Sequence, residues 1–288
     1  MAWTITSRVV SSVTLLIGIA SLILVSRAQA LTFAAPMDDV TWKVDSSPFA
    51  CRLKHTIPGF GEAVFERESG EAQGFYLQSP AALFKSGNAS LISRAPQWGV
   101  NRQEVNLGYV PVAASNQPVT LNGRLADRLL MELYMGMAPT FSRASAAGDD
   151  VVIDVVVSSI NFRKVYDQYQ ACFAQLLPYS FRQLAASELR FAPAEVALSL
   201  DAKKRLDQIV EYLQASPDQI TLQIDGYADQ RGRIADNMQL AQERAAVIAE
   251  YFLDKGIEGQ RISINHHGER QKPGKRSMAS KATIKLVR

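Results

Sequence analysis

One stretch, residues 220–252, constrains the fold of this chain more than any other. It starts with Ile220, Leu222 and Ile224, which alternate with polar residues. This period of two is typical of a β-strand with one buried face. After Gly226 the apolar residues recur at the spacing of a helix with one apolar stripe. The stretch therefore predicts a strand, a short loop and a long helix.

Two opposite charges lie in this unit. Asp229 falls in the loop that follows the strand, Arg244 falls on the helix, and Asn237 lies near the first helical turn. A carboxylate and a guanidinium with space between them suit a zwitterionic ligand, whose ammonium would bind Asp229 and whose carboxylate would bind Arg244. The alternative is a partly exposed ion pair worth about 0 to 1 kcal/mol, and the spacing by itself favours that alternative.

The same unit resembles the OmpA-like peptidoglycan-binding domain. The matching residues, in order and spacing, are Gly226-Tyr227-Ala228-Asp229, Gly232, Asn237, Leu240 and Arg244-Ala245. The resemblance implies that Asp229 and Arg244 bind the diaminopimelate residue of the peptidoglycan stem peptide and that Asn237 lies beside them. It also implies that Tyr227, Gly232 and Leu240 support the pocket.

Three positions depart from the family pattern. Ala228 stands where the family usually has Thr, Ala241 where it has Ser, and Ser280-Lys281-Ala282 where it has Asn-Arg-Arg. Each change removes hydrogen-bonding capacity, so we expect a modest affinity for the cell wall.

The first thirty residues have the pattern of a secretory signal peptide. Arg8 precedes an apolar run over residues 9–25, and Ala28 and Ala30 form a small-residue cleavage site. We expect cleavage near Ala30 and a periplasmic mature protein. An uncleaved membrane anchor is the alternative, because the run is just long enough to span a bilayer.

Length and charge limit the remaining possibilities. The chain of 288 residues, 47% of them hydrophobic, has room for about two domains. Without Arg8 and Arg27 it has one more basic than acidic residue, so we expect no nucleic-acid partner. Nothing in the sequence indicates a cofactor.

The cysteines and the adjacent histidines are the candidates for a cross-link and for metal binding. Cys51 and Cys172 are the only cysteines, and an even pair in an exported protein predicts one disulfide. Two buried free thiols are the alternative. His266 and His267 are adjacent, so on a strand they point to opposite faces and cannot bind the same ion. We therefore expect no metal site.

Residues 31–182 predict a mostly antiparallel β domain. Short strand-like pieces alternate there with turn sequences such as Asp45-Ser46-Ser47-Pro48. The expected strands are Thr41 to Val44, Ala63 to Phe65, Phe75 to Leu77, Ser90 to Ser93, Val119 to Leu121 and Val151 to Val157. Two helices are expected, from about Gly123 to Gly136 and from about Tyr166 to Leu177, the second carrying Cys172.

Residues 183–288 predict a different architecture. Strands at Ser187 to Phe191, around Ile262 and Ile264, and at Ala282 to Val287 join the strand described first. A helix from about Asp201 to Gln214 adds to the long one. We therefore expect a mixed four-stranded sheet with two helices on one face, an α/β sandwich, in a chain of the α+β class.

The amino-terminal part resembles the MotY family. The matching strings are His55-Thr56-Ile57-Pro58-Gly59-Phe60-Gly61-Glu62-Ala63-Val64-Phe65, Ser90-Leu91-Ile92-Ser93, Pro139-Thr140-Phe141-Ser142, Val157-Ser158-Ser159 and Tyr179-Ser180-Phe181, together with the placement of both cysteines. The resemblance implies a periplasmic flagellar-motor protein whose amino-terminal half associates with the basal body. There, with a MotX-like protein, the family forms the T ring that holds sodium-type stators of the PomA/PomB kind.

Three functions are compatible with the sequence. The first is a non-enzymatic tether that binds peptidoglycan with one domain and the flagellar basal body with the other. The second is a general OmpA-like linker between envelope and cell wall, unrelated to motility. The third is a cell-wall hydrolase or amidase, but the sequence has no G-x-S-x-G or H-E-x-x-H motif, so we expect no catalytic residues.

Overall fold

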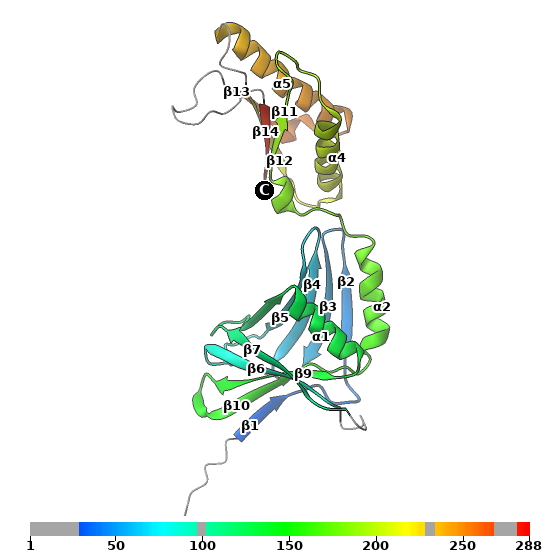
Figure 1. Cartoon of the computed structure of the whole chain (residues 1–288), viewed down its shortest axis with the longest axis vertical. Coiled ribbons are helices and arrows are strands. Elements are labelled where there is room, and N and C mark those ends of the chain that lie inside the picture. Colours follow the sequence, from blue (N-terminus) through cyan, green and yellow to red (C-terminus); the bar gives the residue numbers. More distant parts are fainter. Residues whose placement is uncertain (1–28, 97–101, 228–233, 268–280) are drawn as a thin grey trace, which may run out of the picture.

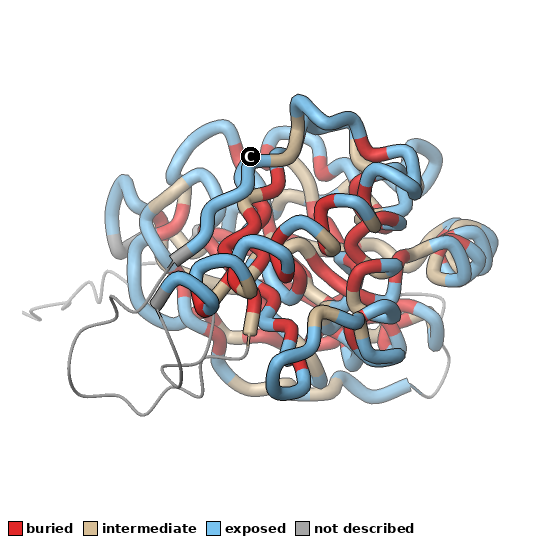
Figure 2. Tube along the Cα trace, turned by 90° about the horizontal axis from the view of Figure 1, so that it is seen from above, coloured by how far each residue is buried: buried red, intermediate tan, exposed pale blue. Residues whose placement is uncertain are grey.

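The computed structural model describes residues 29–96, 102–227, 234–267 and 281–288. A β-rich part occupies the lower half of Figure 1, and a smaller part with a sheet and two long helices occupies the upper half. Seen from above, buried segments gather on the inside and exposed segments on the outside (Figure 2). The α+β class expected from the sequence is confirmed.

Two five-stranded sheets form the amino-terminal part. One has the order β1-β10-β9-β6-β7, and its strands are β1 (Gln29–Phe33), β6 (Gly87–Arg94), β7 (Val105–Val112), β9 (Ala138–Ser145) and β10 (Gly148–Val156). The other has the order β2-β3-β4-β5-β8, and its strands are β2 (Trp42–Ser46), β3 (Ala50–Ile57), β4 (Gly61–Glu68), β5 (Gln73–Gln78) and β8 (Val119–Asn122). Neighbouring strands are antiparallel except β1, which runs parallel to β10.

Two helices accompany these sheets, α1 (Arg124–Tyr134) and α2 (Phe162–Phe173). On α1 the buried residues Ala126, Leu129, Leu130 and Leu133 recur at helical spacing, so one stripe of this helix faces the core. Side chains from both sheets and both helices share one core, in which the rings of Phe75 on β5 and Phe141 on β9 stack 5.4 Å apart. Both sheets therefore bury their inner faces against the same interior.

All six strands expected in this part are present, as β2, β4, β5, β6, β8 and β10. Four strands, β1, β3, β7 and β9, were not predicted from the sequence. β3 has a readable signal, because Cys51, Leu53, His55 and Ile57 are buried and alternate with more accessible residues. The polar histidine in that series conceals the alternation.

The second helix was predicted four residues too late at both ends. Asn161 precedes α2 in the left-handed region, at φ 61°, and the helix starts directly after it. At the other end, the N–H of Leu177 donates to the carbonyl of Pro48 at 2.9 Å, so Leu177 packs against the β2–β3 hairpin and does not extend the helix. A contact between distant segments thus overrides the local apolar spacing.

The carboxyl-terminal part contains the predicted mixed sheet of four strands. The order is β11-β14-β12-β13, and the strands are β11 (Ala186–Arg190), β12 (Thr221–Tyr227), β13 (Ile262–His267) and β14 (Lys281–Val287). β14 is antiparallel to β11 and β12, whereas β13 is parallel to β12. The helical elements are α3 (Phe181–Leu184), α4 (Leu200–Ala215), α5 (Ile234–Asp254) and the short 3₁₀ helix η1 (Gly259–Arg261).

The helices α4 and α5 cover one face of this sheet, as predicted (Figure 1). Ser199 caps α4, because its Oγ accepts the N–H of Ala202 at 3.1 Å. The carboxyl-terminal part has a core of its own, to which Leu177 and Tyr179 already belong. The predicted domain boundary between residues 182 and 183 stays a prediction.

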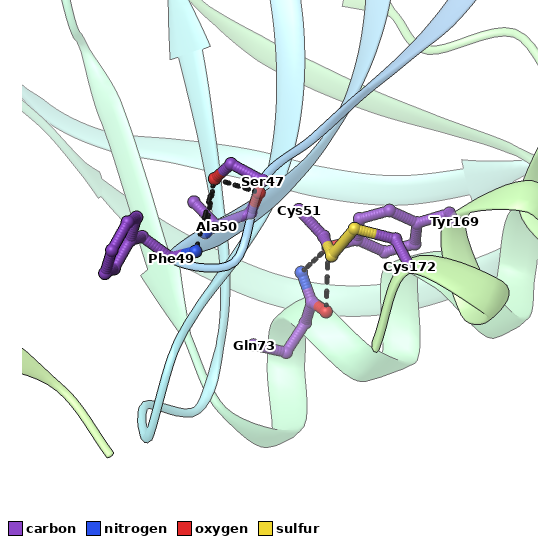
Figure 3. Close-up of a disulfide and its surroundings, with 7 residues drawn as sticks. All are labelled: Ser47, Phe49, Ala50, Cys51, Gln73, Tyr169 and Cys172. Atoms are coloured by element: carbon purple, nitrogen blue, oxygen red, sulfur yellow. Dashed lines mark hydrogen bonds between the residues drawn. A yellow bond between two sulfur atoms is a disulfide. The ribbon is translucent and has the colours of Figure 1, made fainter. Parts of the chain in front are cut away.

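The Cys51–Cys172 disulfide expected from the cysteine count is confirmed, with Cα atoms 6.1 Å apart. It joins the start of β3 to the last turn of α2 (Figure 3). Beside it, Gln73 Nε2 donates to the hydroxyl of Tyr169 at 2.9 Å. The buried environment raises the pKa of Tyr169 above its ordinary value. The disulfide thus connects the sheet to the helix that leads toward the carboxyl-terminal part.

The expected signal peptide falls almost wholly outside the described residues. The predicted cleavage site near Ala30 lies within β1, and the pairs Leu31↔Ile153, Thr32↔Asp154 and Phe33↔Val155 lie beyond it. Within the described ranges, no helix is both long and apolar enough to cross a membrane.

Candidate functional site

The candidate site lies where β12 ends and α5 begins. Gly226 allows the two elements to approach each other, because a Cβ atom at this position would stand 2.0 Å from the carbonyl oxygen of Ala241. The first glycine of the pattern is therefore required by close packing of α5 on β12. Asp229, Gly232 and Ala228 lie outside the described residues, so the predicted binding of one ligand between Asp229 and Arg244 stays a prediction.

Arg244 has the most constrained side chain of the site. It lies on α5 and is 0% exposed, which is rare for a guanidinium. Its Nε donates to the carbonyl of Glu195 at 2.9 Å, Nη1 donates to the carbonyl of Tyr227 at 3.2 Å, and Nη2 donates to the carbonyl of Ala192 at 3.1 Å. These bonds hold the plane of the guanidinium in one orientation.

The three carbonyl acceptors of Arg244 come from two separate segments of the chain. Tyr227 is the last residue of β12, whereas Ala192 and Glu195 lie between β11 and α4, where Ala194 has a positive φ of 60°. The guanidinium carbon also lies 5.1 Å from the ring centroid of Phe191. Arg244 therefore stabilises the local fold as well as marking the site.

Asn237 lies in the first turn of α5, as predicted, and its side chain is buried. No hydrogen-bond acceptor for its Nδ2 is present among the described residues. Leaving a buried amide donor without a partner costs about 1 to 3 kcal/mol. Asn237 and Arg244 are seven positions apart, so both lie on the face of α5 that is turned toward β12.

The supporting residues are less buried. Tyr227 and Leu240 are both half-buried. The Nζ of Lys281 lies 5.9 Å from the ring centroid of Tyr227 and also donates to Oε2 of Glu188 at 2.9 Å. This hydrogen bond lowers the pKa of Glu188. The structure thus brings Tyr227, Asn237, Leu240 and Arg244 to one end of the carboxyl-terminal sheet.

Two of the departures from the family pattern, Ala241 and Ala282, lie beside Gly226. Ala241 is buried on α5, next to Gly226. Ala282 is buried on β14 and pairs with Gly226 in the sheet. Methyl groups therefore stand where the family pattern has hydrogen-bonding side chains.

Several residues of this region were not found from the sequence. The carbonyl acceptors of Ala192 and Glu195 leave no side-chain signature, so no sequence pattern could have identified them. Asp225 on β12 is buried, and its position between Ile224 and Gly226 could have indicated it. Among the described residues, no three His, Cys, Asp or Glu side chains are grouped so that they could hold a metal ion.

Comparison with known families agrees with this architecture. Residues 33–178 match the model of the MotY N-terminal domain, and residues 190–283 match the model of the OmpA family. The chain is thus of the class that joins a β-rich domain to an OmpA-type domain.

Individual relatives identify the family. The chain is 30% identical over 250 residues to the sodium-type flagellar protein MotY of Vibrio parahaemolyticus. This match covers 83% of this chain and 82% of that protein. The chain belongs to the MotY family.

Other relatives match a shorter part of the chain. Outer membrane protein A of Serratia odorifera is 31% identical over 84 residues, which is 29% of this chain and 35% of that protein. The crystal structure of the peptidoglycan-associated lipoprotein from Burkholderia pseudomallei is 19% identical and covers 35% of this chain and 89% of that chain, with a TM-score of 0.31.

Proposed function

We propose that this protein is a non-enzymatic component of the flagellar motor that binds peptidoglycan through its carboxyl-terminal domain. The relative from Vibrio is named a sodium-type flagellar protein, and the carboxyl-terminal domain matches the OmpA family. A motor that generates torque needs a fixed mount. A covalent polymer such as the cell wall can provide that mount, whereas a fluid membrane cannot.

The observation that carries the proposal is that Arg244 and Asn237 lie on the same face of α5. A guanidinium held by three carbonyl groups loses little side-chain freedom when it binds a carboxylate, so its orientation is preorganised. The buried Nδ2 of Asn237 supplies a donor for which the described residues offer no acceptor. In the proposed complex, Arg244 binds the carboxylate of a diaminopimelate group and Asp229 binds its ammonium. Because Arg244 is fully buried, the ligand must displace the groups that cover it.

We also propose that the protein is exported to the periplasm, with cleavage near Ala30, and that its amino-terminal domain associates with the flagellar basal body. A MotX-like protein and a sodium-type stator are the expected neighbours. This part of the proposal rests on the family resemblance.

Binding to purified peptidoglycan tests the proposed clamp. Arg244→Ala is a poor probe, because it would leave three main-chain carbonyls without a donor and would destabilise the fold. Asp229→Asn and Asn237→Ala are better variants. We expect each to reduce co-sedimentation with peptidoglycan by about tenfold or more, which corresponds to the loss of one charged or buried hydrogen bond. Free diaminopimelate should compete with the parent protein.

Asp236→Asn is the matched control, because Asp236 is an exposed carboxylate in the first turn of the same helix. It should bind like the parent. If both clamp variants also sediment like the parent, the clamp is wrong.

Two further assays separate the remaining functions. Swimming of a deletion strain distinguishes a motor component from a general envelope linker, because loss of a linker would give a leaky envelope and normal swimming. Incubation with peptidoglycan distinguishes a binding protein from a hydrolase, and we expect no released fragments.

A further inference from the structure

A basic cavity lies at one end of the amino-terminal part, between the end of α1 and the start of α2. Its volume is about 510 Å³, and its walls include Arg102, Arg163 and Lys164. Among the described residues that line it there is no Asp or Glu. The described walls of the cavity therefore concentrate positive charge.

The start of α2 adds to this imbalance. Arg163 and Lys164 occupy the first turn of the helix, which contains no acidic residue. A helix N-terminus has a partial positive charge and is stabilised by anions, so two cations here are unfavourable for the isolated chain. The side chain of Asn161 accepts no capping hydrogen bond from this turn, and its Nδ2 donates to the carbonyl of Val40 at 3.3 Å. Departures from the usual sequence preferences of a helix start are expected at functional or strained sites.

One of the cations is held in place. The Nε of Arg163 donates to the carbonyl of Tyr134 at 2.8 Å, and its guanidinium carbon lies 5.2 Å from the Tyr134 ring centroid. An arginine that is ordered before binding loses less side-chain entropy when a ligand arrives. Arg163 is thus positioned for an anion.

Large apolar side chains are exposed at the end of α1, next to the cavity residue Met135. Met131 and Tyr134 on α1 are 51% and 40% exposed, and Met135, directly after the helix, is 40% exposed. Met135 also lines the cavity. Methionine, tyrosine and arginine are enriched at protein interfaces, where aromatic and arginine side chains often carry most of the binding energy.

We propose that this α1–α2 surface, formed by Arg102, Met131, Tyr134, Met135, Arg163 and Lys164, binds an acidic segment of a partner protein. Carboxylates of the segment enter the cavity and pair with the three cations, and a neighbouring apolar side chain packs on the two methionines. A protein segment fits better than a phosphate group, because the cations and the apolar side chains adjoin in one place and a peptide offers both kinds of group. The proposal does not depend on peptidoglycan binding by the other domain.

Calorimetric titration of the full-length, disulfide-bonded protein with a synthetic peptide tests this surface. The probe is a short glutamate peptide with one central leucine, and the matched peptide has glutamine in place of glutamate. We expect only the glutamate peptide to bind, and its affinity should fall as salt is added.

The informative variant is Arg102→Glu/Lys164→Glu. In the part of the chain that the structure describes, neither side chain makes a hydrogen bond or an ion pair, so the fold should persist. We expect the affinity to fall by at least about tenfold, and Met135→Ala should weaken binding independently. The control Lys203→Glu/Lys204→Glu makes the same change of charge at exposed positions on α4 and should bind like the parent. The proposal is overturned if the peptide does not bind, if both charge-reversed variants weaken binding equally, or if only phosphatidylglycerol vesicles bind.

Discussion

Gly70, in the turn between β4 and β5, lies directly against Ser180 at the start of α3. A Cβ atom on Gly70 would stand 2.6 Å from the main-chain nitrogen of Ser180. Next to this contact, Gln183 Nε2 donates to the carbonyl of Gly70 at 3.2 Å. On the β2–β3 hairpin, the ring of Phe49 meets the ring of Tyr212 on α4 edge-on, with centroids 5.0 Å apart. The β-rich part and the OmpA-type part thus meet at a specific joint.

We predict that Gly70→Ala opens this joint. Gly70 has a φ of +67°, which strains alanine, and the nearest atoms to the added methyl group include main-chain atoms of Ser180 and Tyr179, which cannot rotate away. Small-angle X-ray scattering should therefore give a larger radius of gyration for the variant than for the parent.

Gly123→Ala separates the effect of strain from the effect of the contact. Gly123 has a similar φ of +60°, but no atom lies within 4 Å of a Cβ built there. Gly123 has a ψ of −132°, where alanine is strained, so the variant should lose about 1 to 3 kcal/mol of stability without a change in the radius of gyration. Equal scattering profiles for both variants would contradict the proposed joint.

We predict a large loss of stability when the disulfide is removed. Cys51 and Cys172 are 121 positions apart, and closing a loop of this length stabilises the folded state by about 4 to 5 kcal/mol in the chain-entropy model. Cys51→Ser/Cys172→Ser should lower the free energy of unfolding in urea by about 2 to 5 kcal/mol. Dithiothreitol should destabilise the parent to a similar extent and leave the double variant unchanged.

His55 should make stability depend on pH. It is buried on β3, its Nε2 accepts the N–H of Ser158 at 3.3 Å, and its Nδ1 lies 3.1 Å from the carbonyl of Thr41. Burial lowers its pKa to about 4 from its ordinary value of 6.5. The folded protein therefore binds fewer protons than the unfolded chain between these values. The contribution of neutral His55 to the free energy of unfolding is complete above pH 6.5. It is lost as the pH falls toward 4, by on the order of 3 kcal/mol in total.

Urea unfolding at several pH values checks this prediction. His55→Gln should be less stable than the parent at pH 7 because it loses the stacking on Trp42, whose ring centroid lies 4.6 Å away. Its stability should nevertheless change less between about pH 6.5 and 4.5, because glutamine does not titrate. Parallel pH profiles for the two proteins would exclude His55 as the source.

We predict that Gly226→Ala disrupts the packing of α5 on β12. The added methyl group would stand 2.0 Å from the carbonyl oxygen of Ala241, so the helix must move. Overpacking of this kind costs about 1 to 3 kcal/mol or more, and peptidoglycan binding should decrease with it because Arg244 and Asn237 move with the helix. Gly148→Ala is the matched control, since Gly148 is also in a strand and has open space around a Cβ. Its stability should stay within about 1 kcal/mol of the parent.

The sequence predicted those features that depend on local spacing. β12 and α5 follow from the change of apolar period after Gly226, and the mixed sheet with two helices follows from the order of such units. The Cys51–Cys172 bond follows from the number of cysteines in a chain expected to be exported. Strands with weak alternation, such as β7 and β9, were missed because their burial depends on neighbouring strands.

By itself, then, the sequence determined the two kinds of fold and the disulfide, because periodicity and motifs can be read along the chain and two cysteines allow one pairing. The roles of Asp229 and Arg244 as ligand-binding charges stay a prediction. Only the tertiary structure decided how Arg244 is held, since its acceptors Ala192 and Glu195 lie about fifty positions earlier and contribute main-chain carbonyls. It also decided the joint at Gly70 and the gathering of Arg102 with Arg163 in one cavity. These contacts join segments that are distant in the chain, and no local pattern encodes which distant segments meet.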